Sequence, residues 1–344
     1  MKHPAQKFAV HNDIIYFAFG PNIQAVQDGK IRFQWKYSQI EDPIPIQHDA
    51  KFGSGIRNII AGHDRIVAVS DDKFLRVFDL ELKFLSKREL VKRAVNLCFA
   101  PNDCSILIGD KFGDVTRHEL NPAEAQPLRL PNEKPLNVGK ILLGHVSMLT
   151  SLTTSINNKT KQGYIITGDR DEHIRISGYP NTFVIERFLL GHRAYVTALE
   201  VVGHLLVSGG GENVVIVWNW ETGEELGRIQ LVDDEQVAVN RIVAISESEI
   251  LISIEGGINV FLLNLMNMAR KTIGIGTKVL DIKVIKERIL VSVDDARILV
   301  NLQNIDGKWE VSPVELPLDI SYHVAQSAVP LFPLTEIRKR KYED

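Results

Sequence analysis

The stretch that decides the fold reads Thr167-Gly-Asp-Arg-Asp-Glu-His-Ile-Arg-Ile-Ser177. Isoleucines precede its polar turn at positions 165 and 166 and follow the turn at positions 174 and 176. Two short apolar runs on either side of such a turn predict a β-hairpin. The pattern returns in Val207-Ser-Gly-Gly-Gly-Glu-Asn-Val-Val-Ile-Val-Trp218 and is preceded by Ile108-Gly-Asp-Lys-Phe-Gly-Asp-Val115. The chain is therefore internally repeated.

The repeats have a period of about 40 residues, which is typical of propeller blades or solenoids. Each unit ends its third expected strand in a step from apolar to polar residues. Four strands separated by Gly, Asn and Asp turns, repeated seven times, predict an all-β, seven-bladed propeller around a central channel. A pair of two-sheet sandwiches would not explain the even period. The expected unit ends lie near Asp28, Asp79, Glu119, Gly178, Asn219, Leu262 and Asn301.

Two intervals between units are long, and both contain proline-rich segments, at residues 38–50 and 121–139. Proline cannot donate to a strand ladder, so we expect both segments to be surface loops. The remaining chain fits one propeller domain over residues 1–334, followed by a basic tail at 335–344. Whether residues 320–329 or the N-terminal residues complete the last blade stays open.

The composition fits a globular protein with a full core, since 44% of the 344 residues are hydrophobic. The formal net charge of −3 argues against a surface that binds nucleic acid indiscriminately. Cys98 and Cys104 are the only cysteines and fit no zinc or redox spacing. The sequence shows no signal peptide and no apolar run of membrane-spanning length. We therefore expect a soluble intracellular protein.

The fourth and fifth units resemble WD repeats, in which a Gly-His precedes the first strand and a Trp-Asp ends the third. The fifth unit has Glu212 in the turn where the pattern has aspartate. The histidines of the two Gly-His pairs, considered in isolation, could be metal ligands or general bases. The resemblance implies instead that they donate to a buried turn acid, with Asp169 and Glu172 left facing outward. The network so implied consists of His145, Thr167, Asp171, His192, Ser208 and Trp218.

A closer resemblance is carried by four segments in order, Gly109–Asp114, Gly144–Leu149, Thr167–Arg175 and Phe188–His192. Together they are similar to the non-catalytic WD-repeat subunit of the eukaryotic tRNA guanine-N7 methyltransferase. The similarity is strong over residues 105–220 and only architectural toward both ends. It implies a chain that is not an enzyme and binds no cofactor or metal. It also implies a catalytic partner that uses S-adenosylmethionine to methylate a variable-loop guanosine of tRNA.

Aligning the third and fourth units places Lys111 and Arg170 at equivalent turns of neighbouring blades. Two cations would then lie side by side on one rim, and the planar guanidinium suits a carboxylate on another protein. The plain alternative is that both are solvated, or that Arg170 pairs with Asp169 or Glu172. The resemblance favours a surface that docks the methyltransferase subunit. We expect this surface to contain Lys111, Phe112, Asp169, Arg170, Glu172 and Arg193.

Four consecutive cations near the C-terminus form a candidate nuclear import signal or an arm that touches tRNA phosphate. The alternative is a solvated, disordered terminus. We expect the protein in the nucleus, and an additional cytoplasmic pool stays open. We expect tRNA to be bound through the complex, and direct contact between this chain and tRNA also stays open. The four residues are Arg338, Lys339, Arg340 and Lys341.

A rival hypothesis makes the chain a generic WD-repeat adaptor, in ubiquitin ligation or ribosome assembly, that uses the same rim for another peptide. An enzyme is the weakest hypothesis, because the sequence contains no recognisable catalytic constellation. Gly274-Ile-Gly276 and Gly209-Gly-Gly211 lack the Lys-Ser/Thr and the spacing of phosphate loops.

Overall fold

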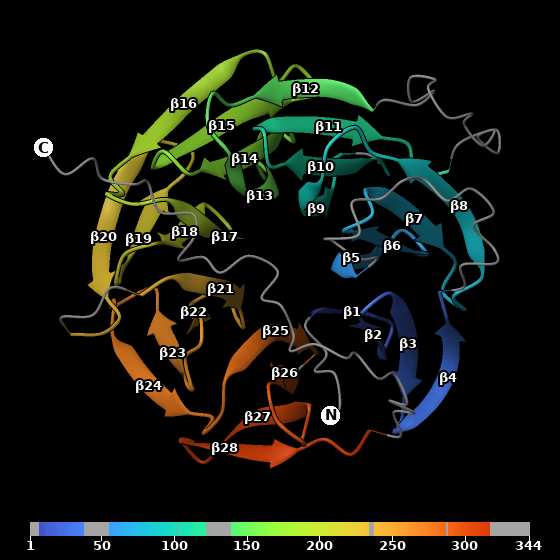
Figure 1. Ribbon diagram of the computed structural model, residues 1–344. Coiled ribbons are helices and arrows are strands. Elements are labelled where there is room, and N and C mark those ends of the chain that lie inside the picture. The colour runs from blue at the N-terminus through green and yellow to red at the C-terminus, as the bar shows by residue number, and fades with distance from the viewer. Residues whose placement is uncertain are drawn as a thin grey trace, which may run out of the picture.

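The computed structural model describes residues 7–37, 55–102, 104–121, 139–233, 237–286 and 288–316. Within these residues, 28 strands form seven four-stranded antiparallel sheets. The sheets stand as blades around a central axis (Figure 1). The predicted all-β, seven-bladed propeller is confirmed.

The strands follow chain order, four to a blade, and the first strand of each blade is the innermost. They are β1 (Lys7–His11), β2 (Ile14–Phe19), β3 (Asn22–Gln27), β4 (Lys30–Trp35), β5 (Ile56–Gly62), β6 (Arg65–Ser70), β7 (Phe74–Phe78), β8 (Phe84–Glu89), β9 (Ala94–Phe99), β10 (Ile106–Asp110), β11 (Asp114–His118), β12 (Lys140–Gly144), β13 (Leu149–Ile156), β14 (Gly163–Asp169), β15 (His173–Tyr179), β16 (Ile185–Leu190), β17 (Val196–Val202), β18 (Leu205–Gly210), β19 (Val214–Asn219), β20 (Glu224–Gln230), β21 (Val239–Ala244), β22 (Glu249–Ile254), β23 (Asn259–Asn264), β24 (Arg270–Gly274), β25 (Val279–Ile285), β26 (Arg288–Val293), β27 (Leu299–Ile305) and β28 (Lys308–Pro313).

Most expected unit ends fall at or next to the end of a third strand, but Leu262 and Asn301 lie inside β23 and β27. The strand β27 continues past Asn301 because it forms a long hairpin with β28, whose tip carries Asp306 and Gly307 at positive φ. Exposed polar residues in that hairpin resemble the end of a strand in the sequence pattern. The basic tail and nearly all of both proline-rich segments lie outside the described residues.

The middle strands are buried on both faces, because each blade packs between two others. Every residue of β10 and β18 is buried. Gly109 and Gly168, which open the Gly-Asp motifs, allow the next blade to approach closely. A Cβ on Gly109 would lie 2.1 Å from a side-chain carbon of Leu149, and one on Gly168 would lie 2.8 Å from Val196. The repeated glycine therefore serves the packing of one blade on the next.

Innermost strands are joined from blade to blade by side chains that donate to backbone carbonyls. Thr197 Oγ1 in β17 donates to the carbonyl oxygen of Val239 in β21 at 2.6 Å. Asn240 Nδ2 in β21 donates to the carbonyl oxygen of Leu280 in β25 at 3.1 Å. The same kind of bond links β9 to β13, where Asn96 is the donor.

The ring closes through Asp281 of β25, which is fully buried. Its carboxylate accepts a hydrogen bond from Arg241 Nε of blade 6 at 2.7 Å and one from the backbone N–H of Phe8 of blade 1 at 3.5 Å. Burial alone would raise the pKa of Asp281. Arg241, Lys7, Lys283 and the Phe8 N–H outweigh that effect and hold the pKa below its ordinary value. One carboxylate thus ties three blades together.

The described residues show how the first and last blades meet. In the described part of the chain, every blade is built from four consecutive strands, and β1 contacts both β5 and β25. First and last blades therefore meet face to face without exchanging a strand. Residues 320–329 lie outside the described residues.

Candidate partner-binding rim

Two turns and one loop bring the main candidate residues to one face of the propeller. Lys111 and Phe112 lie in the turn between β10 and β11 of blade 3. Arg170 and Glu172 lie in the corresponding turn between β14 and β15 of blade 4. The loop of residues 145–148 connects β12 of blade 3 to β13 of blade 4. We call these three segments the blade 3–4 rim.

The loop contacts both turns. The backbone N–H of His145 donates to the carbonyl oxygen of Gly113 at 2.9 Å, and the N–H of Arg170 donates to the carbonyl oxygen of Met148 at 2.9 Å. Gly113 has a φ of 107°, and a Cβ there would lie 2.5 Å from the carbonyl oxygen of His145. Only glycine fits this position. The turns of the two blades are therefore held on either side of one short loop.

Each turn is shaped by the aspartate that ends the preceding strand. Asp169 Oδ1 accepts from the backbone N–H groups of Asp171 at 2.8 Å and His173 at 3.0 Å. Asp110 Oδ1 accepts from the N–H of Phe112 at 2.7 Å in the equivalent turn. The structural equivalence of the two Gly-Asp motifs places Lys111 and Arg170 at matching positions, both exposed.

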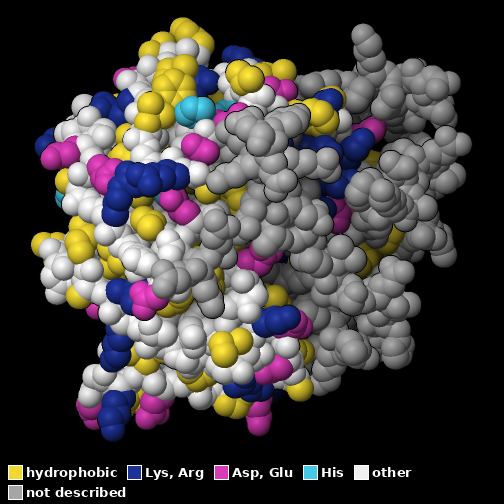
Figure 2. All heavy atoms as spheres, turned by 60° about the vertical axis from the view of Figure 1, so that its left-hand side comes forward, with side chains coloured by type: hydrophobic (Ala, Val, Ile, Leu, Met, Phe, Trp, Pro, Cys, Tyr) yellow, Lys and Arg dark blue, Asp and Glu magenta, His cyan; other side chains and the backbone are white. Residues whose placement is uncertain are grey.

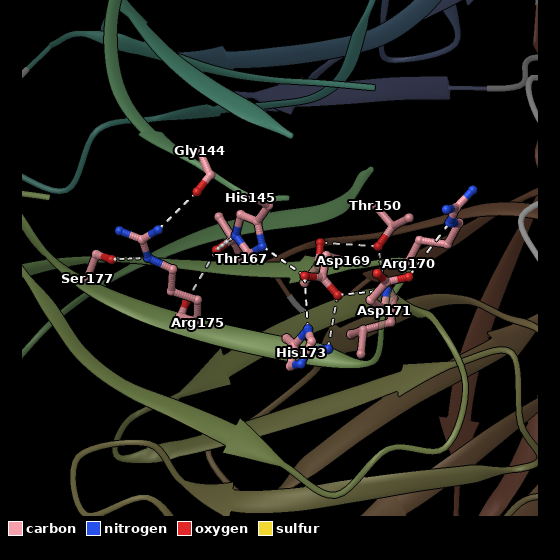
Figure 3. Close-up of polar contacts among 12 residues, drawn as sticks. Gly144, His145, Thr150, Thr167, Asp169, Arg170, Asp171, His173, Arg175 and Ser177 are labelled. Atoms are coloured by element: carbon pink, nitrogen blue, oxygen red, sulfur yellow. Dashed lines mark hydrogen bonds and ion pairs between the residues drawn. The ribbon is translucent and has the colours of Figure 1, made fainter. Parts of the chain in front are cut away.

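The structure gives Asp169 the role expected of Asp171 (Figure 3). Asp169 is 3% exposed and its Oδ2 accepts from His145 Nδ1 at 2.9 Å. His145 Nε2 lies 2.7 Å from Thr167 Oγ1. Alternate residues of a strand share one face, so Thr167 and Asp169 of β14 meet the same histidine, whereas Asp171 lies in the turn beyond the strand. The expectations that Asp169 faces a partner and that Asp171 accepts from the histidine were wrong.

Asp169 is stabilised in its charged form. Its burial would raise the pKa, but the hydrogen bond from His145, the N–H of His173 and the two nearby imidazoles lower it below the ordinary value. The pKa of Glu212 in blade 5 is lowered in the same way, against its burial, by the hydrogen bond from His192. Both networks therefore stabilise the fold above the ordinary carboxylate pKa and lose that contribution as the pH falls through the folded pKa.

Blade 5 contains the more complete network. His192 Nδ1 donates to Glu212 Oε1 at 2.6 Å, and His192 Nε2 lies 2.7 Å from Ser208 Oγ. Trp218 Nε1 donates to the same hydroxyl at 2.8 Å. The glutamate, longer by one methylene, replaces the aspartate of the repeat pattern while keeping the acid in reach of the histidine.

Blade 4 lacks the tryptophan, and an arginine that was not predicted from the sequence stabilises the same region. Arg175 is buried in β15 and donates from Nε to Ser177 Oγ at 2.9 Å (Figure 3). Its two terminal nitrogens donate to the carbonyl oxygens of Gly144 at 3.1 Å and Thr182 at 2.9 Å. A cation between the two isoleucines of a central strand was the available signal. Arg175 fixes the strand end from which the 145–148 loop begins.

Replacing Ser208 with alanine should destabilise the propeller. The change leaves His192 Nε2 and Trp218 Nε1 without their shared partner in a buried site, which costs about 1–3 kcal/mol for each unsatisfied group. Urea unfolding should show a lower midpoint with an unchanged slope, whereas alanine at the exposed Ser312 should leave the midpoint in place. Equal midpoints for the two variants would contradict the role given to the network.

The rim cations are open to solvent and only weakly paired. Arg170 Nε lies 3.9 Å from Asp171 Oδ1, and the Arg170 side chain is 43% exposed. A half-exposed pair at this distance contributes about 0–1 kcal/mol. Arg170 can therefore exchange Asp171 for a better placed carboxylate on another protein.

Phe112 gives the rim an aromatic centre between two lysines. Its side chain is 54% exposed, with Lys92 Nζ 4.0 Å and Lys111 Nζ 5.3 Å from the ring centroid. Val146, in the loop between the two turns, is fully exposed. Lys92 and Val146 were not predicted from the sequence, although both lie in loops that precede a first strand, as Arg193 does. Aromatic residues and arginine are enriched at protein interfaces, and this surface carries both in Phe112 and Arg170.

Arg193 lies one blade further along the same face. Its backbone N–H donates to Glu212 Oε1 at 3.2 Å, which fixes the loop before β17 against the turn of blade 5. The structure thus places Lys111, Phe112 and Arg170 in turns on either side of one loop, and Arg193 in the equivalent loop before the next blade. Glu172, with a φ of 77°, lies in the same turn as Arg170.

A second apolar surface runs along the outer strand of blade 4. Figure 2 shows hydrophobic side chains gathered at the upper edge of the molecule, in the region of β16, while charges of both signs are interspersed over the other described residues of this view. Phe188 and Leu190 of β16 are 46% and 66% exposed, and Phe183 in the preceding loop is 79% exposed. These exposed side chains form an apolar surface on the outer edge of blade 4.

The described residues contain no group of three or more His, Cys, Asp or Glu side chains that could hold a metal ion. In the same part of the chain, no helix has the length and hydrophobicity needed to cross a membrane. Burial raises the pKa of the Cys98 thiol to about 12, which makes it unreactive at neutral pH.

The family model described as the tRNA methyltransferase TRM82 WD40 domain matches residues 36–137 and 123–310. Among curated relatives, the tRNA (guanine-N(7)-)-methyltransferase non-catalytic subunit trm82 of Aspergillus clavatus is 32% identical over 74% of this chain and 64% of its own length. The subunits of Candida glabrata and Saccharomyces cerevisiae are 33% and 37% identical over 54% and 50% of this chain, and over 46% and 39% of their own lengths. The chain therefore spans less than two thirds of these relatives.

Two solved structures share the fold at low sequence identity. A chain of the mitotic checkpoint complex aligns with a TM-score of 0.62 and 13% identity over 88% of this chain and 90% of its own length. The computationally designed Ika8 protein aligns with a TM-score of 0.58 and 16% identity over 91% and 97%. These likenesses establish only the propeller fold, whereas the sequence relatives and the family model identify the family. The chain belongs to the family of tRNA methyltransferase TRM82 WD40 domains.

Proposed function

We propose that this chain is the non-catalytic scaffold subunit of a tRNA guanine-N7 methyltransferase and docks the catalytic subunit on the blade 3–4 rim. The names of the fungal relatives support the enzyme complex. The observation that supports the docking site is that two exposed turns, with Lys111 and Arg170, are hydrogen-bonded to one short loop between them. The comparisons do not favour a generic WD-repeat adaptor.

The rim is suited to contact rather than to chemistry. Guanidinium and ammonium groups are protonated at neutral pH and cannot accept a proton there. They can donate to carboxylates of a partner, with Arg170 offering a planar fork and Lys111 a point charge. Phe112 and Val146 add apolar area that a partner would remove from water.

The proposed mechanism is a shift of the partner's conformational population. A scaffold can raise activity only by binding the active conformer of the catalytic subunit more tightly than the inactive one. S-adenosylmethionine and the reacting guanosine would both lie on that subunit, and tRNA would be reached through the complex. We also propose nuclear localisation from the cations at 338–341, which imaging of a chain without them would test.

A methylation assay on bulk tRNA tests the proposed function. The chain alone should transfer no methyl group, the catalytic subunit alone should show little activity, and the mixture should be active, with the product identified as 7-methylguanosine. Full activity of the catalytic subunit by itself, or an inactive mixture of well-folded proteins, would contradict the scaffold role. Recovery of ligase or ribosomal components as stoichiometric partners would favour the adaptor instead.

A further inference from the structure

The outer strand of blade 4 is more apolar than those of the other blades. Of the seven outer strands that the structure describes, β16 carries three exposed large hydrophobic residues, and no other carries more than two. Large exposed apolar patches mark interaction sites on folded proteins. We call the group of Phe183, Ile185, Phe188 and Leu190 the outer apolar surface (Figure 2).

The strand β16 has one face in the core and the other toward solvent. Leu189 is 1% exposed and belongs to the cluster that contains Val196 and Trp218 of blade 5. Adjacent residues of a strand point to opposite faces, so Phe188 and Leu190 lie on the face turned away from blade 5. On a solvated face of a sheet, polar side chains are the usual choice. The apolar side chains here therefore call for a partner.

The loop before β16 holds its phenylalanine outward. Thr182 is 2% exposed, and its Oγ1 donates to the carbonyl oxygen of Leu142 in β12 at 2.6 Å. Its own carbonyl oxygen accepts from Arg175 Nη2 at 2.9 Å. Phe183, the next residue, is nonetheless 79% exposed. Because its neighbour is fixed from two sides, this ring can be buried by a partner at a small entropic cost.

The outer apolar surface adjoins the blade 3–4 rim through His173, which follows the turn of Arg170 directly. His173 Nδ1 lies 3.3 Å from Asp169 Oδ2, the carboxylate that shapes this turn (Figure 3). The imidazole also lies edge-on to Phe188, with 6.1 Å between the ring centroids. In the register of β15 and β16, His173 is directly opposite Leu190. Rim and apolar surface are therefore continuous.

The rim alone is too small for a stable interface. It consists of two turns and one short loop, whereas a specific interface buries roughly 800 Å² and about 20–30 residues on each partner. A protein seated on the rim must cover neighbouring surface as well. Along the outer side of blade 4 that surface is apolar, as the centre of an interface requires.

The form of the partner segment follows from the edge of β16. The register between β15 and β16 shifts at Ile176 and Ser177, and such irregularities disrupt the pairing of a further strand. A helix needs no regular edge, because apolar side chains along one of its faces can lie over exposed anchors.

We propose that the catalytic subunit packs the apolar face of an amphipathic helix on the outer apolar surface of blade 4, while acidic side chains beside that helix contact the rim. This inference rests on the proposed function and adds a second, uncharged half to the docking site. The rim would supply contacts that salt screens, and the outer apolar surface would supply contacts that salt leaves intact.

Isothermal titration calorimetry of the catalytic subunit with variants of the full chain tests this surface. Phe183→Ser and Leu190→Asp should each raise Kd by at least about tenfold, since each removes an apolar anchor from a dehydrated contact. That loss should be equally large at low and high salt, whereas the loss caused by Arg170→Ala should shrink at high salt. Met266→Ser, at a residue of blade 6 that is 80% exposed, should bind as the wild type does.

Wild-type affinity of either variant, with Arg170→Ala still impaired, would overturn this inference and leave the proposed function intact. A wild-type chain that binds no catalytic subunit would overturn both. If the variants do not fold, hydroxyl-radical footprinting of the wild-type complex decides. Oxidation of Phe183, Phe188 and Leu190 should fall when the complex forms, while that of Met266 stays constant, and unchanged oxidation of the three residues would refute the surface.

Discussion

Replacing Arg170 with alanine should weaken the proposed binding of the catalytic subunit by roughly 2–5 kcal/mol, which is about 30- to 4,000-fold in Kd. Most of that loss would come from a partner carboxylate left without its cation in a dehydrated interface. Lys111→Glu should be at least as damaging, because it adds repulsion to the loss of a donor. Isothermal titration calorimetry with the purified catalytic subunit would measure both effects.

The fold should survive these changes. Arg170 is half exposed and only loosely paired with Asp171, so its removal should leave the melting temperature nearly unchanged. Lys308→Glu, a matched charge reversal on the outer strand of blade 7, should bind the partner as the wild type does. Wild-type affinity of Arg170→Ala and Lys111→Glu would remove the blade 3–4 rim from the interface.

Changing Asp281 to asparagine should lower the free energy of unfolding by about 3–5 kcal/mol, because Arg241 loses its charged partner at the ring closure. The effect should depend on pH. The folded pKa of Asp281 lies below its ordinary value, so its contribution is present above the unfolded pKa of about 4 and is lost as the pH falls through the folded pKa.

Urea unfolding at pH 7 and at acidic pH would measure both the loss of stability and its dependence on pH. The wild type and Asp281→Asn should differ most at neutral pH and converge on acidification, while Glu310→Gln on exposed β28 should follow the wild type throughout. Limited proteolysis should release β1 earlier from the Asp281 variant. A stability difference that does not change with pH would exclude the charge as the cause.

The architecture could be predicted because the blades repeat the same short sequence pattern and the same local packing. Close packing of a second strand on the next blade requires glycine at 109 and 168, and the following aspartate shapes the turn through backbone N–H groups. These constraints act within about 40 residues, so they recur visibly in the sequence. The equivalence of Lys111 and Arg170 follows from the same repetition.

The residues that were misplaced or missed depend on strand parity or on contacts between distant segments. Asp169, which shares a strand face with Thr167, meets His145. Blade 5 has Gly210 at the equivalent position, and its histidine meets the turn acid Glu212 instead, so the repeat pattern does not say which acid is used. Asp281 closes the ring by contacting Phe8, which lies at the other end of the described chain. Lys92 contacts the rim because its ammonium group lies over the ring of Phe112.

The most direct test of the scaffold account is a titration of this chain into a fixed, low concentration of the catalytic subunit while tRNA methylation is measured. The wild type and Arg170→Ala should reach the same maximal rate, because the rim binds the partner and takes no part in the chemistry. The variant should need at least about 30-fold more protein to reach half of that rate. Coincident titration curves, or a lower maximal rate at saturation, would contradict the account.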